Sequence, residues 1–283
     1  MRGSAMYTPR LRILGAELRA AREAACYGLN ELARKIGVDN GLLSSWEHAK
    51  RCPSSEDVAS ILGALGVAGD TRDRIMALAR GITAADWITY GSPTTGSHQD
   101  AIRAHERDSV AVLAWHPIFI PPLVQVPAYT WAVFSSEQVP SGVINTHAET
   151  LLSRREELAQ RRTPVEIFIG EQALYAAVGD HATQSKQLDY LTNQTLPRHW
   201  SVRVLPVNSG WVFDGFTRYT MADATAVTYC AHRTVGVFLS DQSNQGQPAP
   251  YQHAADWLRA KALEPSQSVR CIASATGRAV PAS

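Results

Sequence analysis

The first 80 residues place apolar side chains at helical spacing in five short runs that are separated by turn signals. Leucine and isoleucine recur three and four positions apart, as in amphipathic helices packed on one core. The predicted helices cover 10–25, 29–36 and 40–48, then a segment that Ser55 caps and Gly66 ends, and a fifth that starts at Asp70 or Thr71. Five helices in about 70 residues predict a compact bundle.

The segment 29–53 has the layout of two helices joined by a tight turn. Gly37 interrupts the first helix, and Asp39 is suited to cap the second because its carboxylate can accept the free N–H groups of the first turn. Two helices joined in this way form a helix-turn-helix, whose second helix lies in the DNA major groove. Its buried stripe is expected from Leu32, Ala33, Ile36, Leu43 and Trp46.

After this bundle the pattern changes, because helical and alternating stretches are mixed. Residues 83–100 have loop composition and are predicted to be a linker. Helices are then predicted over 101–114, 128–135, 143–162, 182–195, 251–262 and 265–275, and strands over 165–169, 201–205, 216–221, 226–229 and 235–239. The expected fold class is α+β, with a five-helix bundle at 1–82 and a mixed α+β domain at 101–283.

Composition and charge narrow the function. The chain of 283 residues is 45% apolar and has a net charge of +1. Its first 60 residues hold nine Lys/Arg against seven Asp/Glu, which is a weak excess of positive charge for a nucleic-acid binder.

The four cysteines form no C-x-x-C pair, which favours reduced thiols in a cytoplasmic protein and no metal site. The apolar stretch 110–126 is interrupted by prolines, so it cannot cross a membrane as one helix. No cofactor motif is present.

The first part resembles the lambda-repressor-like, Cro/repressor (Xre-type) helix-turn-helix domain. The residues that carry the resemblance are Leu14-Gly15, Leu18-Arg19, Arg22-Glu23, Glu31 to Ala33, Ile36 to Val38, Leu43, Trp46, Glu47 and Lys50 to Pro53. The resemblance implies that an arginine of the first helix pairs with the glutamate after the recognition helix, here Arg22 with Glu47.

The second part resembles the uncharacterised C-terminal domain that accompanies such helix-turn-helix domains in many actinobacterial regulators. The matching residues are Glu106, Ile120 to Gln125, Tyr129, Glu171 with Leu174, Val178-Gly179, Gln187-Leu188 with Leu191, Val204 to Pro206 with Gly210, Ala262-Leu263 and Ser266 to Ser268. The two resemblances span nearly the whole chain in the expected order. They imply a regulator of development, secondary metabolism or a small partner protein.

The first resemblance also implies which residues meet DNA. Base contacts would come from Asn40, Gly41, Ser44 and Ser45, and phosphate contacts from Arg34, Lys35, Lys50 and Arg51. Asn40 can form a bidentate contact with adenine, whereas Gly41 has no side chain and Ser45 is short where the family usually has Arg or Gln. Leu29 and His48 also depart from the family pattern. The bland alternative for the four cations is an ordinary solvated face, and the DNA-reading surface is expected to be weaker than the family norm.

Aromatic and polar residues gather in the second domain near strands and proline-rich loops. The candidates for a ligand pocket are Trp115, His116, Tyr129, Trp131, Trp211, Phe213, Tyr219 and Tyr229. The bland alternative is a core with a few surface aromatics. The commonest catalytic motifs are absent, and if the domain were an enzyme its acid or base would be Glu171, Asp214 or His232.

Three hypotheses fit these patterns. The leading one is a cytoplasmic, homodimeric transcriptional regulator that binds operator DNA and senses a small molecule or a small protein partner. The alternative is a regulator scaffold recruited as a metabolite-binding protein or enzyme, such as a cyclase in natural-product biosynthesis, with weakened or lost DNA binding. The third is an antitoxin-like partner of a small protein.

Overall fold

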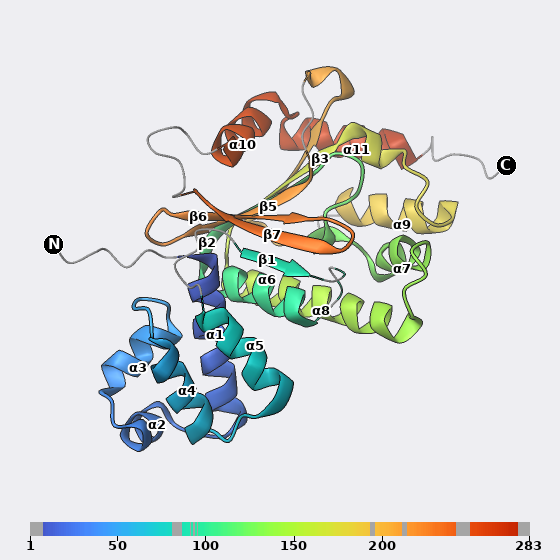
Figure 1. The fold of residues 1–283 in the computed structure, drawn as a ribbon. Helices are drawn as coiled ribbons and strands as arrows, with labels where there is room; N and C mark the ends of the chain where they lie inside the picture. The colour runs from blue at the N-terminus through green and yellow to red at the C-terminus, as the bar shows by residue number, and fades with distance from the viewer. Residues whose placement is uncertain are drawn as a thin grey trace.

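The computed structural model describes residues 8–80, 87–90, 92, 94, 96–192, 196–210, 214–241 and 250–276. In these ranges the chain forms an N-terminal bundle of five helices and a second part built on one seven-stranded sheet (Figure 1). The fold is therefore α+β, as the sequence predicts. None of the helices in the described ranges is long and apolar enough to cross a membrane.

The bundle helices are α1 (Pro9–Ala24), α2 (Leu29–Ile36), α3 (Asn40–Glu47), α4 (Ser55–Ala64) and α5 (Gly69–Ala79). Each of the first four begins close to the position that the sequence predicts. Asp39 caps α3 by accepting from the N–H of Gly41 at 2.8 Å. The residue that caps α4 is Ser54 rather than Ser55, since Ser54 forms a capping box with Asp57. The fifth helix begins at Gly69, just before the predicted start.

Within its described residues, the second part contains six helices and seven strands. The helices are α6 (Gly96–Asp108), α7 (Pro127–Ser135), α8 (Ser141–Gln160), α9 (His181–Thr192), α10 (Pro250–Lys261) and α11 (Pro265–Thr276). The strands are β1 (Trp87–Tyr90), β2 (Ser109–His116), β3 (Val165–Gly170), β4 (Trp200–Leu205), β5 (Phe216–Met221), β6 (Ala226–Ala231) and β7 (Val235–Ser240). Short 3₁₀ segments include η1 (Pro122–Val124), η2 (Glu171–Leu174) and η3 (Val207–Ser209).

The strands form one mixed sheet in the order β1-β7-β6-β5-β2-β3-β4. Strands β2, β3 and β4 are parallel, and the other neighbours are antiparallel. Successive residues of a strand point to opposite faces, so Ile167 belongs to the core shared with α6 and α8 while Phe168 belongs to the core beneath α10. Because both faces are covered, β3 is apolar at almost every position.

Two segments differ from the sequence prediction. Residues 101–114 are expected from their spacing to be one helix, but α6 ends at Asp108 and Ser109 begins β2. The hydroxyl of Ser109 donates to the carbonyl of Glu106 at 2.8 Å and helps to end the helix. The apolar run that follows pairs with β3 and β5, so burial in the sheet overrides the helical spacing. The predicted linker 83–100 contains β1 and the first turns of α6.

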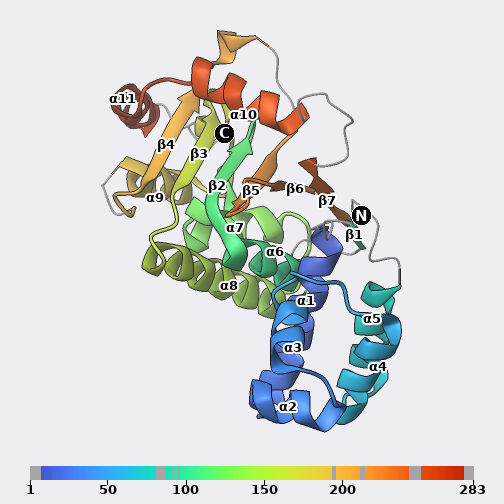
Figure 2. The ribbon, with the colours of Figure 1, turned by 90° about the vertical axis from the view of Figure 1, so that its left-hand side faces the viewer.

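The bundle lies next to α6 and α8, and its helix α1 also contacts β7 of the sheet (Figures 1 and 2). Helix α10 covers the opposite face of the sheet, and α11 packs beside β4 and α9. Helix α1 contacts α6, and Arg12 of α1 pairs with Asp108 of α6 at 3.5 Å. Helix α6 therefore touches the bundle and the sheet domain at once.

Candidate functional site

The α2–α3 pair forms the helix-turn-helix that the sequence predicts. Gly37 ends α2 with a positive φ of 73°, a conformation that glycine adopts without strain, and Asp39 starts the next helix two residues later. The buried side chains of Leu32, Leu43 and Trp46 belong to one core, in which α3 packs on α1 while α2 packs on α3 and α4. Both helices keep an exposed side, with Arg34 and Lys35 on α2 and Asn40 and Gly41 on α3.

An ion pair connects α1 with the end of α3 and stabilises the position of the helix-turn-helix. Arg22 donates from Nε and Nη2 to the two carboxylate oxygens of Glu47, at 2.7 and 2.9 Å, and from Nη1 to the carbonyl of Tyr27 at 3.0 Å. The hydrogen bond to Glu47 raises the pKa of Arg22, because it stabilises the charged guanidinium. The pairing expected from the family resemblance is confirmed.

The residues predicted to meet DNA lie on or beside α2 and α3. The exposed ones are Arg34, Lys35, Asn40, Gly41, Lys50 and Arg51, whereas Ser44 and Ser45 are half-buried. The amide of Asn40 donates to Oδ1 of Asn30 at 2.8 Å, so it is held toward α2. The hydroxyl of Ser45 donates to the carbonyl of Leu42 at 2.6 Å and is thus engaged by its own helix.

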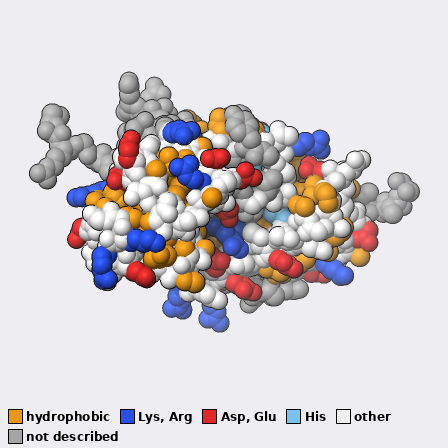
Figure 3. All heavy atoms as spheres, turned by 60° about the horizontal axis from the view of Figure 1, so that its bottom comes forward, with side chains coloured by type: hydrophobic (Ala, Val, Ile, Leu, Met, Phe, Trp, Pro, Cys, Tyr) orange, Lys and Arg blue, Asp and Glu red, His pale blue; other side chains and the backbone are white. Residues whose placement is uncertain are grey.

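The surface around the bundle has mixed charge. Figure 3 brings the underside of the molecule forward and shows Lys and Arg side chains spread among acidic and apolar ones on that face. Lys35 lies 4.6 Å from the ring centroid of Tyr27, so part of its charge is used within the bundle. Of the four predicted phosphate contacts, Arg34, Lys50 and Arg51 are exposed as well.

A second site is a cavity of about 350 Å³ in the sheet domain. It lies at the carboxyl end of β2, between the sheet and helices α7 and α8, and the loop 117–122 forms part of its wall. Ligands commonly bind outside the carboxyl ends of parallel strands. The loop is held in place because Gln125 donates to the carbonyl of Ile120 at 2.7 Å and the N–H of Ile120 donates to Tyr129 at 3.3 Å.

His116 is fixed at the wall of this cavity. Its Nδ1 accepts from the backbone N–H groups of Ile118 and Phe119, at 3.3 and 2.9 Å, so the hydrogen of the neutral ring is on Nε2. Burial lowers the pKa of His116 to about 4, and the charge of Asp214 opposes this shift. A Cβ at Gly215 would lie 2.5 Å from the imidazole, so only glycine allows this approach.

The other candidates of the second domain fall in several places. Trp115, Tyr229, Asp214 and His232 line the same cavity as His116. Tyr129 and Tyr219 are fully buried in the core, and the indole of Trp131 donates to Asn145 at 2.8 Å near the surface. Glu171 accepts from the N–H of Val207 at 3.0 Å and does not line the cavity. Trp211 and Phe213 lie outside the described residues.

His147 of α8 and Phe134 of α7 are among the residues of the cavity wall that sequence reasoning missed. Their rings meet edge to face at 4.9 Å, and both line the cavity. A signal for His147 was present, because it occupies the apolar stripe of α8 between Ile144 and Leu151. A histidine in such a stripe marks a buried polar position.

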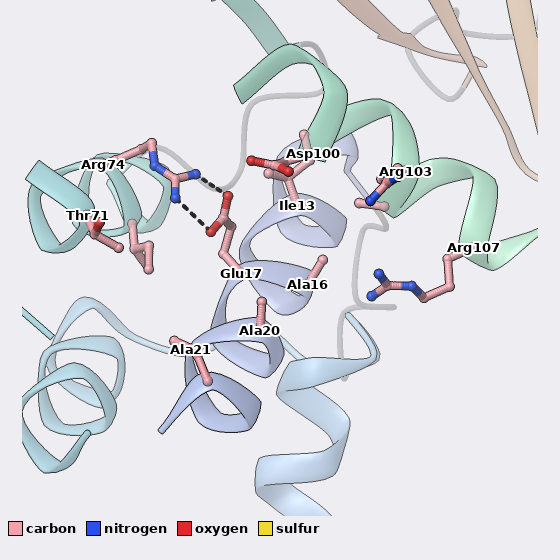
Figure 4. A pocket seen from close by; sticks show the side chains of 13 residues that line it. Ile13, Ala16, Glu17, Ala20, Ala21, Thr71, Arg74, Asp100, Arg103 and Arg107 are labelled. Atoms are coloured by element: carbon pink, nitrogen blue, oxygen red, sulfur yellow. Dashed lines mark hydrogen bonds and ion pairs between the residues drawn. The ribbon is translucent and has the colours of Figure 1, made fainter. Parts of the chain in front are cut away.

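A third hollow separates the bundle from the sheet domain. It has a volume of about 370 Å³ and lies between α1, α5 and α6. Figure 4 shows Arg74 of α5 paired with Glu17 of α1, while Arg103 and Arg107 extend from α6 toward α1. The Arg74 Nη2–Glu17 Oε2 distance is 3.0 Å. Partial burial raises the pKa of Asp100, which also lines this hollow.

Comparison with known proteins agrees with this two-part architecture. Residues 13–75 match a family described as a helix-turn-helix domain, which supports a DNA-binding regulatory role. Residues 99–274, more than half of the chain, match a family described as a domain of unknown function (DUF5753). The protein is thus a helix-turn-helix protein with an α+β second domain. The chain belongs to the DUF5753 family.

The chain matches no curated protein. Among solved structures, it is similar to the phosphatidylserine synthase of Haemophilus influenzae Rd KW20, at 11% identity and a TM-score of 0.37. The match covers 75% of this chain and 54% of that one, so the chain spans about half the length of that enzyme. This similarity is too low to assign a function.

Proposed function

We propose that this protein is a dimeric DNA-binding transcriptional regulator whose second domain responds to a small molecule or a small protein partner. The observation that carries the proposal is the helix-turn-helix itself. Its core is complete and Glu47 is locked to Arg22, while Asn40, Lys50 and Arg51 stay exposed on or after α3. In this class of domain α3 enters the major groove, so these residues would lie against the duplex.

The contacts with DNA are expected to be few. Arg34, Lys50 and Arg51 would neutralise phosphates, and Asn40 would contact a base edge once it releases Asn30. Ser45 would contribute little because its hydroxyl already bonds to Leu42. A dimer bound to two half-sites doubles these contacts, which compensates for a small interface on each subunit.

The sensing role is supported by the cavity in the sheet domain and by the position of α6. Glu106 of α6 bonds to Arg154 inside the sheet domain, and Arg103 and Arg107 of the same helix extend toward α1. A ligand changes an equilibrium only when it binds one conformation better than another. A shift of α6 on ligand binding would change the orientation of the bundle, and thereby the affinity for DNA.

The direct test is fluorescence anisotropy with DNA taken from upstream of the gene for this protein. We expect a specific complex that weakens as salt rises. Replacing Lys50 or Arg51 with alanine should reduce the slope of log K against log salt by about 0.9 for each phosphate that is no longer neutralised. The matched control is Arg72→Ala, which removes an exposed arginine from α5 and should leave the slope unchanged. Absence of specific binding at micromolar protein would contradict the proposal.

A second candidate function is favoured by two residues of the cavity wall. Asp214 and His232 are both acid or base candidates and both line the cavity, so the site contains groups that could transfer protons to a bound metabolite. Catalysis would appear as conversion of a metabolite at many turnovers per protein. Conversion that disappears in Asp214→Asn, in a protein that does not bind operator DNA, would favour this candidate.

A further inference from the structure

The strongest unexplained feature of the cavity is a pair of unsatisfied polar atoms. Nδ1 of His147 and the phenol oxygen of Tyr229 have no hydrogen-bond partner among the described residues. His147 is 5% exposed and Tyr229 is 6% exposed, and both residues line the cavity. A buried polar group without a partner costs about 1–3 kcal/mol. A molecule that bonds to both atoms would recover that cost.

The rest of the wall is mainly apolar and contains flat rings. It includes Ile118, Phe119, Ile120, Val133, Phe134 and Phe216. Ile118 and Phe119 are 47% and 38% exposed, so the apolar surface of the loop continues from the wall to the solvent. The volume of about 350 Å³ is at the lower end of the range of about 300–1,000 Å³ for small-molecule sites.

The charge of the wall selects against anions. No lysine or arginine is among the described residues that line the cavity, and Asp214 is exposed at its edge. Burial lowers the pKa of His147 to about 4, so this ring is neutral at pH 7, as is His116. An anion would therefore lose its hydration without gaining a cationic partner.

We propose that this cavity binds a flat, mainly apolar molecule of fused-ring aromatic type without an anionic group, which presents one hydroxyl or carbonyl group to Tyr229 and His147. A hydroxyl suits the pair because it can donate one hydrogen bond and accept another. The rings would lie against Phe134 and the side chains of the loop. This inference rests on the sensing half of the proposed function and names the chemical class of its ligand.

The test uses three probes that differ only in their polar group, 2-naphthol, naphthalene and 2-naphthoate. Each is titrated into the full chain without DNA, and binding is measured by calorimetry at pH 7. We expect one molecule of 2-naphthol per chain, naphthalene about five- to tenfold weaker, and no detectable binding of 2-naphthoate. Equal or tighter binding of the carboxylate, or no binding of 2-naphthol up to its solubility limit, overturns the proposal.

Variants locate the site. Tyr229→Phe keeps the ring and removes the hydroxyl, so 2-naphthol should bind about fivefold more weakly while naphthalene binds as before. Unchanged naphthalene binding also shows that the variant is folded. His147→Phe should likewise weaken the binding of 2-naphthol and leave that of naphthalene unchanged.

The matched control is Tyr251→Phe on the opposite face of the sheet, where Tyr251 bonds to Cys230 at 3.1 Å. The 2-naphthol affinity of this variant should equal that of the original chain. Equal losses in Tyr251→Phe and Tyr229→Phe overturn the assignment.

The probe titrations and the DNA-binding experiment test the two proposals separately. If 2-naphthol binds as expected and no operator complex forms, the cavity is a binding site and the regulatory proposal fails. If operator DNA binds and all three probes fail, the regulator stands and the proposed ligand class is wrong.

Discussion

Arg154 of α8 and Glu106 of α6 form a bidentate ion pair in the interior of the sheet domain. The guanidinium donates from Nε and Nη2 to the two carboxylate oxygens, at 2.8 and 2.6 Å, and from Nη1 to Gln99 at 3.2 Å. Both side chains are 5% exposed. Their charges have left water, so each depends on the other for its stabilisation.

Removing one partner should be costly. Glu106→Gln leaves the buried guanidinium of Arg154 without a counter-charge, and we expect the free energy of unfolding to fall by about 3–5 kcal/mol. Chemical denaturation monitored by circular dichroism measures this. Glu166→Gln is the matched control, because its pair with Arg259 is about 35–40% exposed and should contribute less than about 1 kcal/mol. Similar losses in the two variants would show that burial does not govern these pairs.

A second prediction concerns the contact between α1 and the end of α3. A Cβ at Gly15 would lie 2.7 Å from the carbonyl oxygen of Trp46 and 2.8 Å from that of Glu47. These are backbone atoms, so the helices must separate to accept a methyl group. Gly15→Ala should destabilise the bundle by about 1–3 kcal/mol. Gly63→Ala in α4 is the control; its Cβ meets nothing within 4 Å, and it should stabilise the chain by about 0.5–1 kcal/mol in the same denaturation experiment.

The helices of the bundle could be predicted from the sequence, because the residues that cap and end helices lie where the spacing of buried apolar residues also changes. Asp39 caps α3 and Gly37 ends α2, and both lie where the spacing of apolar residues changes. The segment after Asp108 could not be assigned in this way. Its apolar residues fit a helix and a buried strand equally well, and only pairing with the distant β5 decides between them.

The cavity was partly predictable for a similar reason. His116 and Tyr229 are predicted as pocket residues because they are aromatic or polar and lie near strand ends, and both line it. Tyr219 has the same composition and strand setting, yet it points into the closed core. His147 and Phe134 come from consecutive helices, and their meeting depends on how α7 packs on α8, which the spacing of residues within either helix does not specify.

A third prediction concerns pH. His105 of α6 lies between the rings of Tyr219 and Phe238, at centroid distances of 5.8 and 4.8 Å. Burial lowers its pKa to about 4, the hydrogen bond to Ala101 opposes the shift, and Arg12 adds to it. In the unfolded chain the pKa of histidine is about 6.5. Below that pH the unfolded state binds a proton that the folded state excludes, so stability is lost as the pH falls from about 6.5 to about 4.

Denaturation midpoints across this pH range check the effect. Each pKa unit corresponds to about 1.4 kcal/mol, so His105 should account for a loss of up to about 3 kcal/mol. His105→Phe should lose less stability than the original chain between pH 6.5 and pH 4. Parallel curves for the two proteins would show that His105 is protonated in the folded state as readily as in the unfolded state.

The last prediction compares two polar residues of α3 that differ in their present hydrogen bonds. Asn40 is exposed and bonds only to the side chain of Asn30, a contact that a base edge can replace. The hydroxyl of Ser45 donates to the carbonyl of Leu42 within the same helix, so a contact with DNA would have to break that bond. Asn40→Ala should therefore weaken specific binding by about 1–3 kcal/mol, or roughly five- to 150-fold, while Ser45→Ala changes it less than about twofold.

Anisotropy titrations on the operator and on a scrambled duplex separate specific from non-specific binding. Because non-specific binding comes from phosphates, the scrambled duplex should bind both variants like the original chain. A larger loss for Ser45→Ala than for Asn40→Ala would mean that α3 lies on DNA in a different rotation about its axis.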